Sequence, residues 1–374
     1  MRVFILFFSI ILFSIKIYSQ GCCAGGGGSP IAGGATQGVL QAGQVEISSN
    51  FQYISSDKFK TGDKFTPKLF DKYNSNYNYS KIAYGVTKDF TISIESGYFF
   101  NKIQTGFYDA VLSKSEKIES SGIADLIIFP KFDIVNRVTE KKRFEITLGL
   151  GYKIPLGKHN DSTLVYTNPI SGQQIFTASP PLVQPTNGSN DIILYAFFFK
   201  GFTQKNFRVF ANTIYIRRGW NSLGEKFGDY ASVGLFAGKT FFNNLGITLQ
   251  IKGEQIGKLE AAENVDLLAL YNVNSTSTGS EKITFVPQIN FNYKSLTFYG
   301  LYELPLYENV YGNQLASQHQ FIFGVAYRFF VKAPTCEIPS DAKSYYACTM
   351  KCEGGGGYEP GKCKICGMEL EKVK

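Results

Sequence analysis

Histidine, tryptophan, methionine and charged residues are all scarce in this chain. Its 374 residues include two His, one Trp and three Met, and 18% of them are charged. Histidine is the side chain that most often performs general acid–base catalysis. His159 stands close to Asp161 and Ser162 while His319 stands alone, and adjacency in one loop is not the geometry of a catalytic triad. We therefore predict that the chain is not an enzyme and that His159 lies on a solvated loop.

Long apolar runs are absent beyond the N-terminus. No later segment supplies the roughly 18 consecutive apolar residues of a membrane-spanning helix, so we expect none. The opening stretch MRVFILFFSIILFSIKIYSQ places Arg2 before an apolar run, at 3–15, that has the layout of a secretory signal peptide. We predict a signal peptide at 1–20, cleaved between Tyr18 and Cys22. A lipidated Cys22 is the alternative, because small residues precede it, although the Leu expected upstream is absent.

Charge of one sign is not concentrated along the chain. The net charge is +8, and it falls to +6 once Arg2 and Lys16 leave with the signal peptide. Lys and Arg are scattered among acidic residues, which is typical of solvated loops and of a charged lumen. We expect no nucleic-acid partner.

Aromatic residues and glycine, by contrast, are abundant. The chain has 33 Phe, 23 Tyr and 38 Gly, which argues against disorder and against a long-helix protein and suits an all-β fold. The stretch GCCAGGGGSPIAGGATQG, at 21–38, is too rich in Gly to build a packed element. We predict that the Gly-rich N-terminal segment, 21–43, is a flexible leader or lies in a lumen.

From residue 44 onward, side chains alternate between apolar and polar with a period of two. In FEITLGLGYKIP, Phe144, Leu148 and Leu150 share one face with other apolar residues, while Glu145 and Lys153 share the opposite face. The stretches ITLQIKGE and ITFVPQINFNY repeat this pattern. The predicted strands are 44–57, 78–87, 89–102, 122–135, 142–156, 188–202, 205–218, 227–241, 244–257, 281–293, 295–307 and 316–330.

The connections between these strands alternate in length. They are tight near Lys88, Lys205, Asn243 and Lys294, and short at 136–141. The other connections are long or intermediate, at 58–77, 103–121, 157–187, 219–226, 258–280 and 308–315. Long and short links that alternate, with an even strand number, are typical of bacterial outer-membrane barrels. A soluble β-sandwich shares the period of two, but its strands are usually only about five or six residues long.

The last predicted strand, QHQFIFGVAYRFF, carries one aromatic face and resembles the assembly signal of outer-membrane barrels. We predict an all-β fold, a transmembrane antiparallel up-and-down β-barrel of about 12 strands at 44–331, in the outer membrane of a Gram-negative bacterium. Its lipid-facing side is apolar, and its lumen face carries charges of both signs that either line a channel or pair off as a polar filling. These predicted lumen charges are Glu95, Lys131, Asp133, Glu145, Lys153, Arg208, Lys252, Glu254 and Arg328.

An even strand number places both ends of the barrel on the side of the short turns, which is the periplasmic side. A linker at 332–344 and a Cys-rich domain at 345–374 therefore follow in the periplasm. This domain holds Cys348, Cys352, Cys363 and Cys366, four of the seven cysteines, spaced C-x3-C-x10-C-x2-C.

Two close pairs of thiols separated by a loop suit a tetrahedral metal site. Four thiolates favour Zn, whereas Met350 and Met368 are further candidate thioether ligands that would favour Cu(I). Two disulfides formed across the pairs are the alternative in an oxidising periplasm. Of the remaining cysteines, Cys22 and Cys23 are either mobile thiols or a second soft-metal site, and Cys336 could join either group.

The tail resembles a known family. The residues that carry the resemblance are Tyr346, Cys348, Met350, Pro360-Gly361, Cys363, Cys366-Gly367-Met368 and Leu370. Their pattern is similar to that of the small heavy-metal-binding domain of periplasmic metal-efflux adaptors and metal-transporting ATPases. The first half departs from that pattern, because Thr349 replaces a Pro and Lys351 stands where a His belongs; in the second half Lys364 replaces a Pro. Cys352 could then supply the fourth ligand. The resemblance implies a bound Zn or Cu ion and metal-efflux components as partners.

The barrel distantly resembles outer-membrane transporters of this size. We predict an outer-membrane barrel with a periplasmic heavy-metal-binding tail that acts in transport or handling of Zn or Cu, with outer-membrane lipid and the metal ion as partners. The alternative is a non-transporting surface or structural barrel with a disulfide-stapled tail.

Overall fold

The computed structural model describes residues 38–109, 114–138, 142–242, 244–271, 274–318, 320–331, 346–348, 359–362 and 369–372. The predicted signal peptide lies outside these residues, as do His319, Cys22, Cys23 and Cys336. No helix in the described part of the chain is long and apolar enough to cross a membrane.

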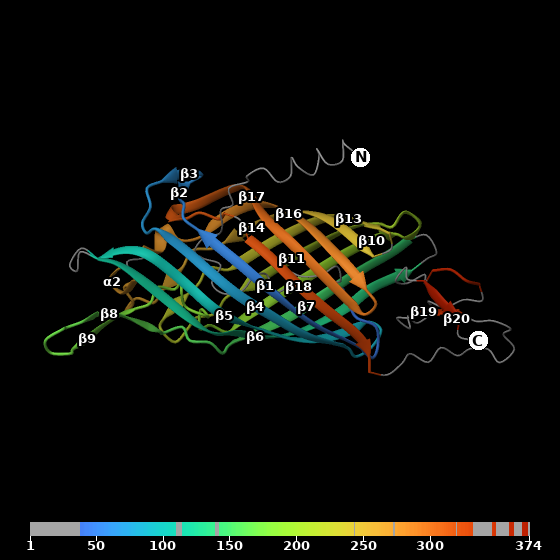
Figure 1. The fold of residues 1–374 in the computed structure, drawn as a ribbon, viewed down its shortest axis with the longest axis horizontal. Helices are drawn as coiled ribbons and strands as arrows, with labels where there is room; N and C mark the ends of the chain where they lie inside the picture. The colour runs from blue at the N-terminus through green and yellow to red at the C-terminus, as the bar shows by residue number, and fades with distance from the viewer. Residues whose placement is uncertain are drawn as a thin grey trace.

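Twelve strands form a closed antiparallel barrel (Figure 1). Each strand pairs with the next barrel strand along the chain, and the first and last pair with each other, with Val45 opposite Phe329. The barrel strands are β1 (Gln44–Ser56), β4 (Lys72–Gly85), β5 (Phe90–Asp109), β6 (Lys114–Val138), β7 (Lys142–Pro155), β10 (Asp191–Phe202), β11 (Phe207–Arg217), β13 (Tyr230–Phe241), β14 (Leu245–Ile256), β16 (Ser280–Tyr293), β17 (Leu296–Leu315) and β18 (Gln320–Phe330). The predicted all-β barrel and its strand number are confirmed.

The two ends of the barrel differ. At one end, here called the short-turn end, tight links join the strands, and one of these links contains η1 (Thr203–Lys205). The first barrel strand, β1, begins at this end, and the last, β18, finishes there. The opposite end, the long-loop end, carries the larger connections. These contain β2 (Phe59–Gly62), β3 (Lys64–Thr66), β8 (Ser162–Thr167), β9 (Gln174–Ala178), β12 (Glu225–Lys226), β15 (Glu260–Ala261), α2 (Leu267–Tyr271) and η2 (Ser275–Ser277).

The strands turn an apolar face outward, as predicted. On β7, Leu148 and Leu150 are 44% and 57% exposed, whereas Glu145 and Lys153 are buried. Large exposed apolar side chains occur on all twelve barrel strands. Such a surface is unstable in water and suits contact with lipid.

The structure corrects four predicted strand boundaries at the long-loop end. β5 and β6 continue through most of the predicted connection at 103–121, β4 begins at Lys72, and β17 runs on through 308–315. Beyond the apolar outer band both faces of a strand meet polar surroundings, so the alternation that reveals a strand fades. Strand ends such as KYNSNYN consequently resemble loops in the sequence.

The lumen is not lined by polar residues alone, which corrects the expected division into an apolar outer and a polar inner face. β10 reads DIILYAFFFKGF and is apolar on both faces, with Ile193, Tyr195 and Phe197 buried inside the barrel. These side chains pack with aromatic residues of β6, β11 and β13, and the rings of Phe210 and Phe236 stack 4.3 Å apart. One wall of the lumen is therefore apolar.

Candidate functional site: the lumen and the Cys-rich tail

The nine predicted lumen charges lie on the inward faces of their strands, and partners surround them. Near the short-turn end, Glu46 of β1 is 2.7 Å from the ammonium of Lys81 on β4, and Arg328 of β18 donates to it at 2.6 Å. Removing one partner from such a buried ion pair typically costs about 3–5 kcal/mol. This cluster therefore stabilises the seam where the barrel closes.

A second ionic cluster lies nearer the long-loop end. The Lys252 ammonium is 2.8 Å from Glu303 and 3.3 Å from Glu254, and Lys282 is 3.0 Å from Glu254. The Tyr230 hydroxyl also donates to Glu254 at 2.6 Å. Two cations and two carboxylates thus balance one another.

The remaining predicted charges also have contacts. Thr147 donates to Asp133 at 2.5 Å, Arg143 pairs with Glu145 at 2.7 Å, and Arg208 donates to Thr248 at 3.3 Å. Charges that contact opposite charges or hydroxyl groups in this way match a polar filling of the barrel better than an open channel lining.

The chain before β1 enters the short-turn end of the lumen. Leu40 is buried, and its backbone N–H donates to the Thr91 hydroxyl of β5 at 2.8 Å. Gly38 lies against Glu145, so close that a Cβ at this position would overlap the carboxylate. The described residues that precede β1 therefore lie beside lumen-facing side chains, whereas residues 21–37 of the Gly-rich segment lie outside the described residues.

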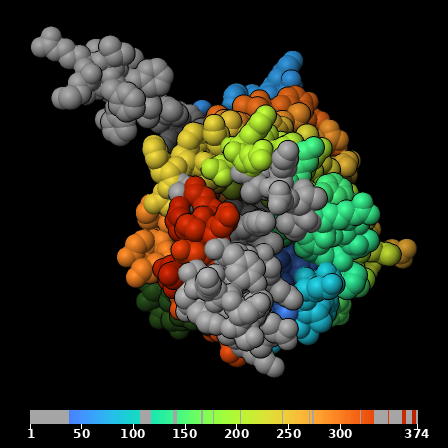
Figure 2. All heavy atoms as spheres, turned by 90° about the vertical axis from the view of Figure 1, so that its right-hand side faces the viewer, coloured from blue at the N-terminus to red at the C-terminus, as the bar shows by residue number. Residues whose placement is uncertain are grey.

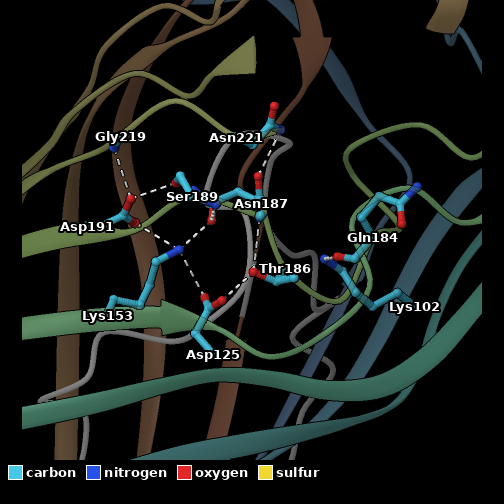
Figure 3. A network of polar contacts seen from close by, with 11 residues as sticks. Lys102, Asp125, Lys153, Gln184, Thr186, Asn187, Ser189, Asp191, Gly219 and Asn221 are labelled. Atoms are coloured by element: carbon cyan, nitrogen blue, oxygen red, sulfur yellow. Dashed lines mark hydrogen bonds and ion pairs between the residues drawn. The ribbon is translucent and has the colours of Figure 1, made fainter. Parts of the chain in front are cut away.

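A loop at 179–190 lies at the long-loop end. Lys153 of β7 is at the centre of a network of polar contacts with this loop (Figure 3). The Lys153 ammonium is 2.8 Å from Asp191 and 3.3 Å from Asp125, and it also donates to the side-chain oxygen of Asn187. Thr186 donates to Asp125 as well. One cation thereby ties two strands and the loop together.

The backbone of the same loop is held by side chains of β5 and β6, which are the neighbours of β7 on one side of the barrel. Lys102 of β5 donates to the Gln184 carbonyl at 2.6 Å, and Ser120 of β6 donates to the Val183 carbonyl. The Val183 side chain is fully buried against Phe59 and Leu315 among other apolar residues. The loop, which we call the lumen loop, therefore lies across the lumen and does not project into solvent.

Sequence reasoning missed the lumen loop, which it treated as part of a long outer connection. One signal was present: the segment SPPLVQPTNGSN contains no charged residue. A solvated loop of that length normally carries charge, so an uncharged loop with Leu182 and Val183 at its centre is a candidate for burial.

Of the tail, the structure describes a small two-stranded sheet. β19 (Tyr346–Cys348) pairs with β20 (Leu370–Lys372), with Cys348 opposite Leu370. A bridge between Lys362 and Glu369 brings a third segment, which precedes Cys363, beside the start of β20. The two strands lie beyond the short-turn end of the barrel, which faces the viewer in Figure 2. Cys352, Cys363, Cys366, Met350 and Met368 lie outside the described residues.

His159 lies at the long-loop end, in the connection between β7 and β8. Its ring Nε2 is 2.8 Å from the Ser222 hydroxyl, while Asp161 lies 3.8 Å from the ammonium of Lys158. The His159–Ser222 contact joins two outer loops, whereas the Lys158–Asp161 contact lies within one.

No family model matches the sequence, and no curated protein matches it. Solved structures do match the fold. An outer-membrane channel from Pseudomonas putida F1 superposes with a TM-score of 0.58 at 13% identity, over 79% of this chain and 99% of that one. The KdgM porin and the TodX monoaromatic hydrocarbon channel each give a TM-score of 0.37, at 8% and 12% identity. KdgM aligns over 76% of this chain and 99% of its own length, and TodX over 84% and 96%. The superposition on the Pseudomonas putida channel shows that the chain has the fold of an outer-membrane β-barrel.

Proposed function

We propose that this protein is an outer-membrane barrel whose periplasmic tail captures a heavy-metal ion, Zn or Cu, for transport or handling. The observation that supports this proposal best is the pairing of β19 with β20. It joins the segment that contains Cys348 to the segment that follows Cys366, so the two halves of the C-x3-C-x10-C-x2-C pattern belong to one small fold.

The donor set suits the proposed ions. The metal would be held by Cys348, Cys352, Cys363 and Cys366. Four thiolates bind Zn or Cu in preference to hard cations such as Mg²⁺. A domain of about thirty residues is too small for an adequate apolar core, so a bound ion would also stabilise its fold. Metal efflux components are the partners that the tail's resemblance implies.

Elemental analysis tests the proposal. Full-length protein, purified in detergent under reducing conditions, should carry about one Zn or Cu ion per chain. The variant with all four cysteines changed to Ser should carry none. Equal metal content in the two proteins would reject the metal site. Intact disulfides in native chain purified without reductant, together with no metal after reducing preparation, would support a disulfide-stapled tail.

The paired lumen charges favour a second candidate function, a surface or structural barrel that does not transport. Conductance in planar lipid bilayers separates the two candidates. Steady ion flux supports transport, and a silent barrel that binds metal assigns the tail to metal handling alone.

A further inference from the structure

Arg208 lies inside the barrel at the short-turn end. It is the second residue of β11, shortly after η1, and it is half-buried. Its two terminal nitrogens donate to the hydroxyl groups of Thr240 on β13 and Thr248 on β14, at 3.2 Å and 3.3 Å. Its Nε is buried and has no hydrogen-bond partner among the described residues. The guanidinium therefore keeps N–H donors that the described part of the chain does not use.

The same guanidinium has no carboxylate partner among the described residues; its contacts there are hydroxyl groups. The lumen carboxylates of β6 and β7, the strands beyond β10, are engaged elsewhere. Glu145 pairs with Arg143 at 2.7 Å, and Asp133 accepts from Thr147 at 2.5 Å. Arginine stays charged in proteins, and a charge that is removed from water without an opposite charge is costly. An anion beside the guanidinium would remove that cost.

The sheet around Arg208 is shaped to let its side chain extend. Gly201 of β10 and Gly238 of β13 lie opposite it on either side. A Cβ built on Gly238 would lie 3.0 Å from the Arg208 Nε and 2.7 Å from the Thr248 hydroxyl oxygen. The absence of a side chain at 238 therefore lets the guanidinium cross β13 and reach β14. Gln288 of β16 follows Thr248 in the same row and is uncharged.

The two threonines add further donors to the same place. Each hydroxyl accepts a hydrogen bond from the guanidinium and keeps its own hydrogen to donate. The Thr248 side chain is 4% exposed, so its position is fixed by its surroundings. A planar guanidinium with hydroxyl donors beside it matches the oxygens of a carboxylate or a phosphate.

We propose that Arg208, Thr240 and Thr248 form a binding site for a small oxyanion, a carboxylate or a phosphate, that enters the lumen from the short-turn end. The site gives the barrel a recognition element for anions at this end. It does not depend on the metal proposed for the tail, because it uses residues of three barrel strands only.

Urea unfolding of the full chain in vesicles of zwitterionic phosphatidylcholine tests this site. Acetate and inorganic phosphate are the probes, each titrated at constant ionic strength against chloride. An anion at about twenty times its dissociation constant shifts the unfolding equilibrium about twentyfold toward the folded state. We expect a saturable shift of this kind for the native protein and none beyond chloride for Arg208→Gln. A response to only one probe also supports the site and identifies which oxyanion it takes.

A second variant tests the hydroxyl donors without removing the charge. Thr240→Val has nearly the same shape as the native side chain, and the loss of one hydrogen bond should weaken anion binding about fivefold. Anion binding that is unchanged in this variant would contradict the assigned geometry.

The matched control is Arg217→Gln, which makes the same change of charge at an exposed position of the same strand. It should keep the native response. Phosphate also strengthens apolar burial in general, so an equal shift in Arg208→Gln and the native protein would show a salt effect only and overturn the proposal. A native protein that responds to both probes as it does to chloride would overturn it as well. Heat-modifiable migration on gels verifies that each variant has a folded barrel.

Discussion

Gly324 of β18 shows how single residues shape the interior of this barrel. It pairs with Tyr299 of β17 and Asn50 of β1, and a Cβ built on it would lie 2.4 Å from the Tyr299 ring. The buried ring therefore occupies the space that a side chain at 324 would need. Gly97 relates to the Tyr77 ring in the same way, with 2.1 Å to the hydroxyl oxygen.

We predict that Gly324→Ala lowers the free energy of unfolding by about 1–3 kcal/mol, because the added methyl group overpacks the lumen. Urea unfolding in lipid vesicles measures this change. Gly253→Ala is the control, since a Cβ there meets nothing within 4 Å and should be neutral or slightly stabilising. Equal behaviour of the two variants would contradict the overpacking argument.

The face of the barrel that a residue occupies was more predictable from the sequence than the residues that it contacts. The alternation along FEITLGLGYKIP correctly assigned Glu145 and Lys153 to the lumen, because strand side chains must alternate between faces. It did not reveal that Lys153 meets Asp125 and Asp191. That contact depends on the register between strands far apart in sequence, which the pattern of a single strand does not contain.

At the scale of elements, strands with one apolar face were predictable, and the lumen loop was not. Strands in the apolar band repeat a clear period of two, and most of their predicted ends lie within a few residues of the observed ones. The lumen loop has no period, and it is held in place by Lys102, Ser120 and Lys153 of three strands and by the packing of Val183. Such convergence is a property of the closed barrel.

We predict that Val183→Asp releases the lumen loop. A carboxylate at this fully buried position would lack a partner among Phe59, Phe70 and Leu315, and its burial would cost several kcal/mol. The loop should therefore leave the lumen, which raises conductance in planar bilayers and exposes 179–190 to proteinase K. Ile170→Asp is the control, because Ile170 is 96% exposed at the tip of the β8–β9 hairpin. Unchanged conductance and protease resistance in Val183→Asp would show that the loop does not obstruct the barrel.

At the scale of the whole molecule, the barrel and the tail are separate structures. The described tail strands, β19 and β20, lie beyond the short-turn end of the barrel. The barrel closes through β1 and β18, and Val331, the final described residue before 332–345, donates its N–H to the Gly43 carbonyl at 2.9 Å. The barrel's own pairing is therefore complete without the tail. The even strand number, which the sequence already indicated, brings the start of β1 and the end of β18 together at the short-turn end.

The sidedness of the molecule yields a final prediction. If the short-turn end faces the periplasm, proteinase K added to intact cells should cut near Ile170 in the exposed β8–β9 hairpin and leave the tail whole. Antibodies against 345–374 measure tail survival, and permeabilising the outer membrane should make the tail sensitive as well. Strand pairing should hold the two barrel fragments together, so the cut barrel keeps its heat-modifiable migration. Loss of the tail from intact cells would reverse the orientation and reject a periplasmic metal site, yet it would leave the barrel fold unchanged.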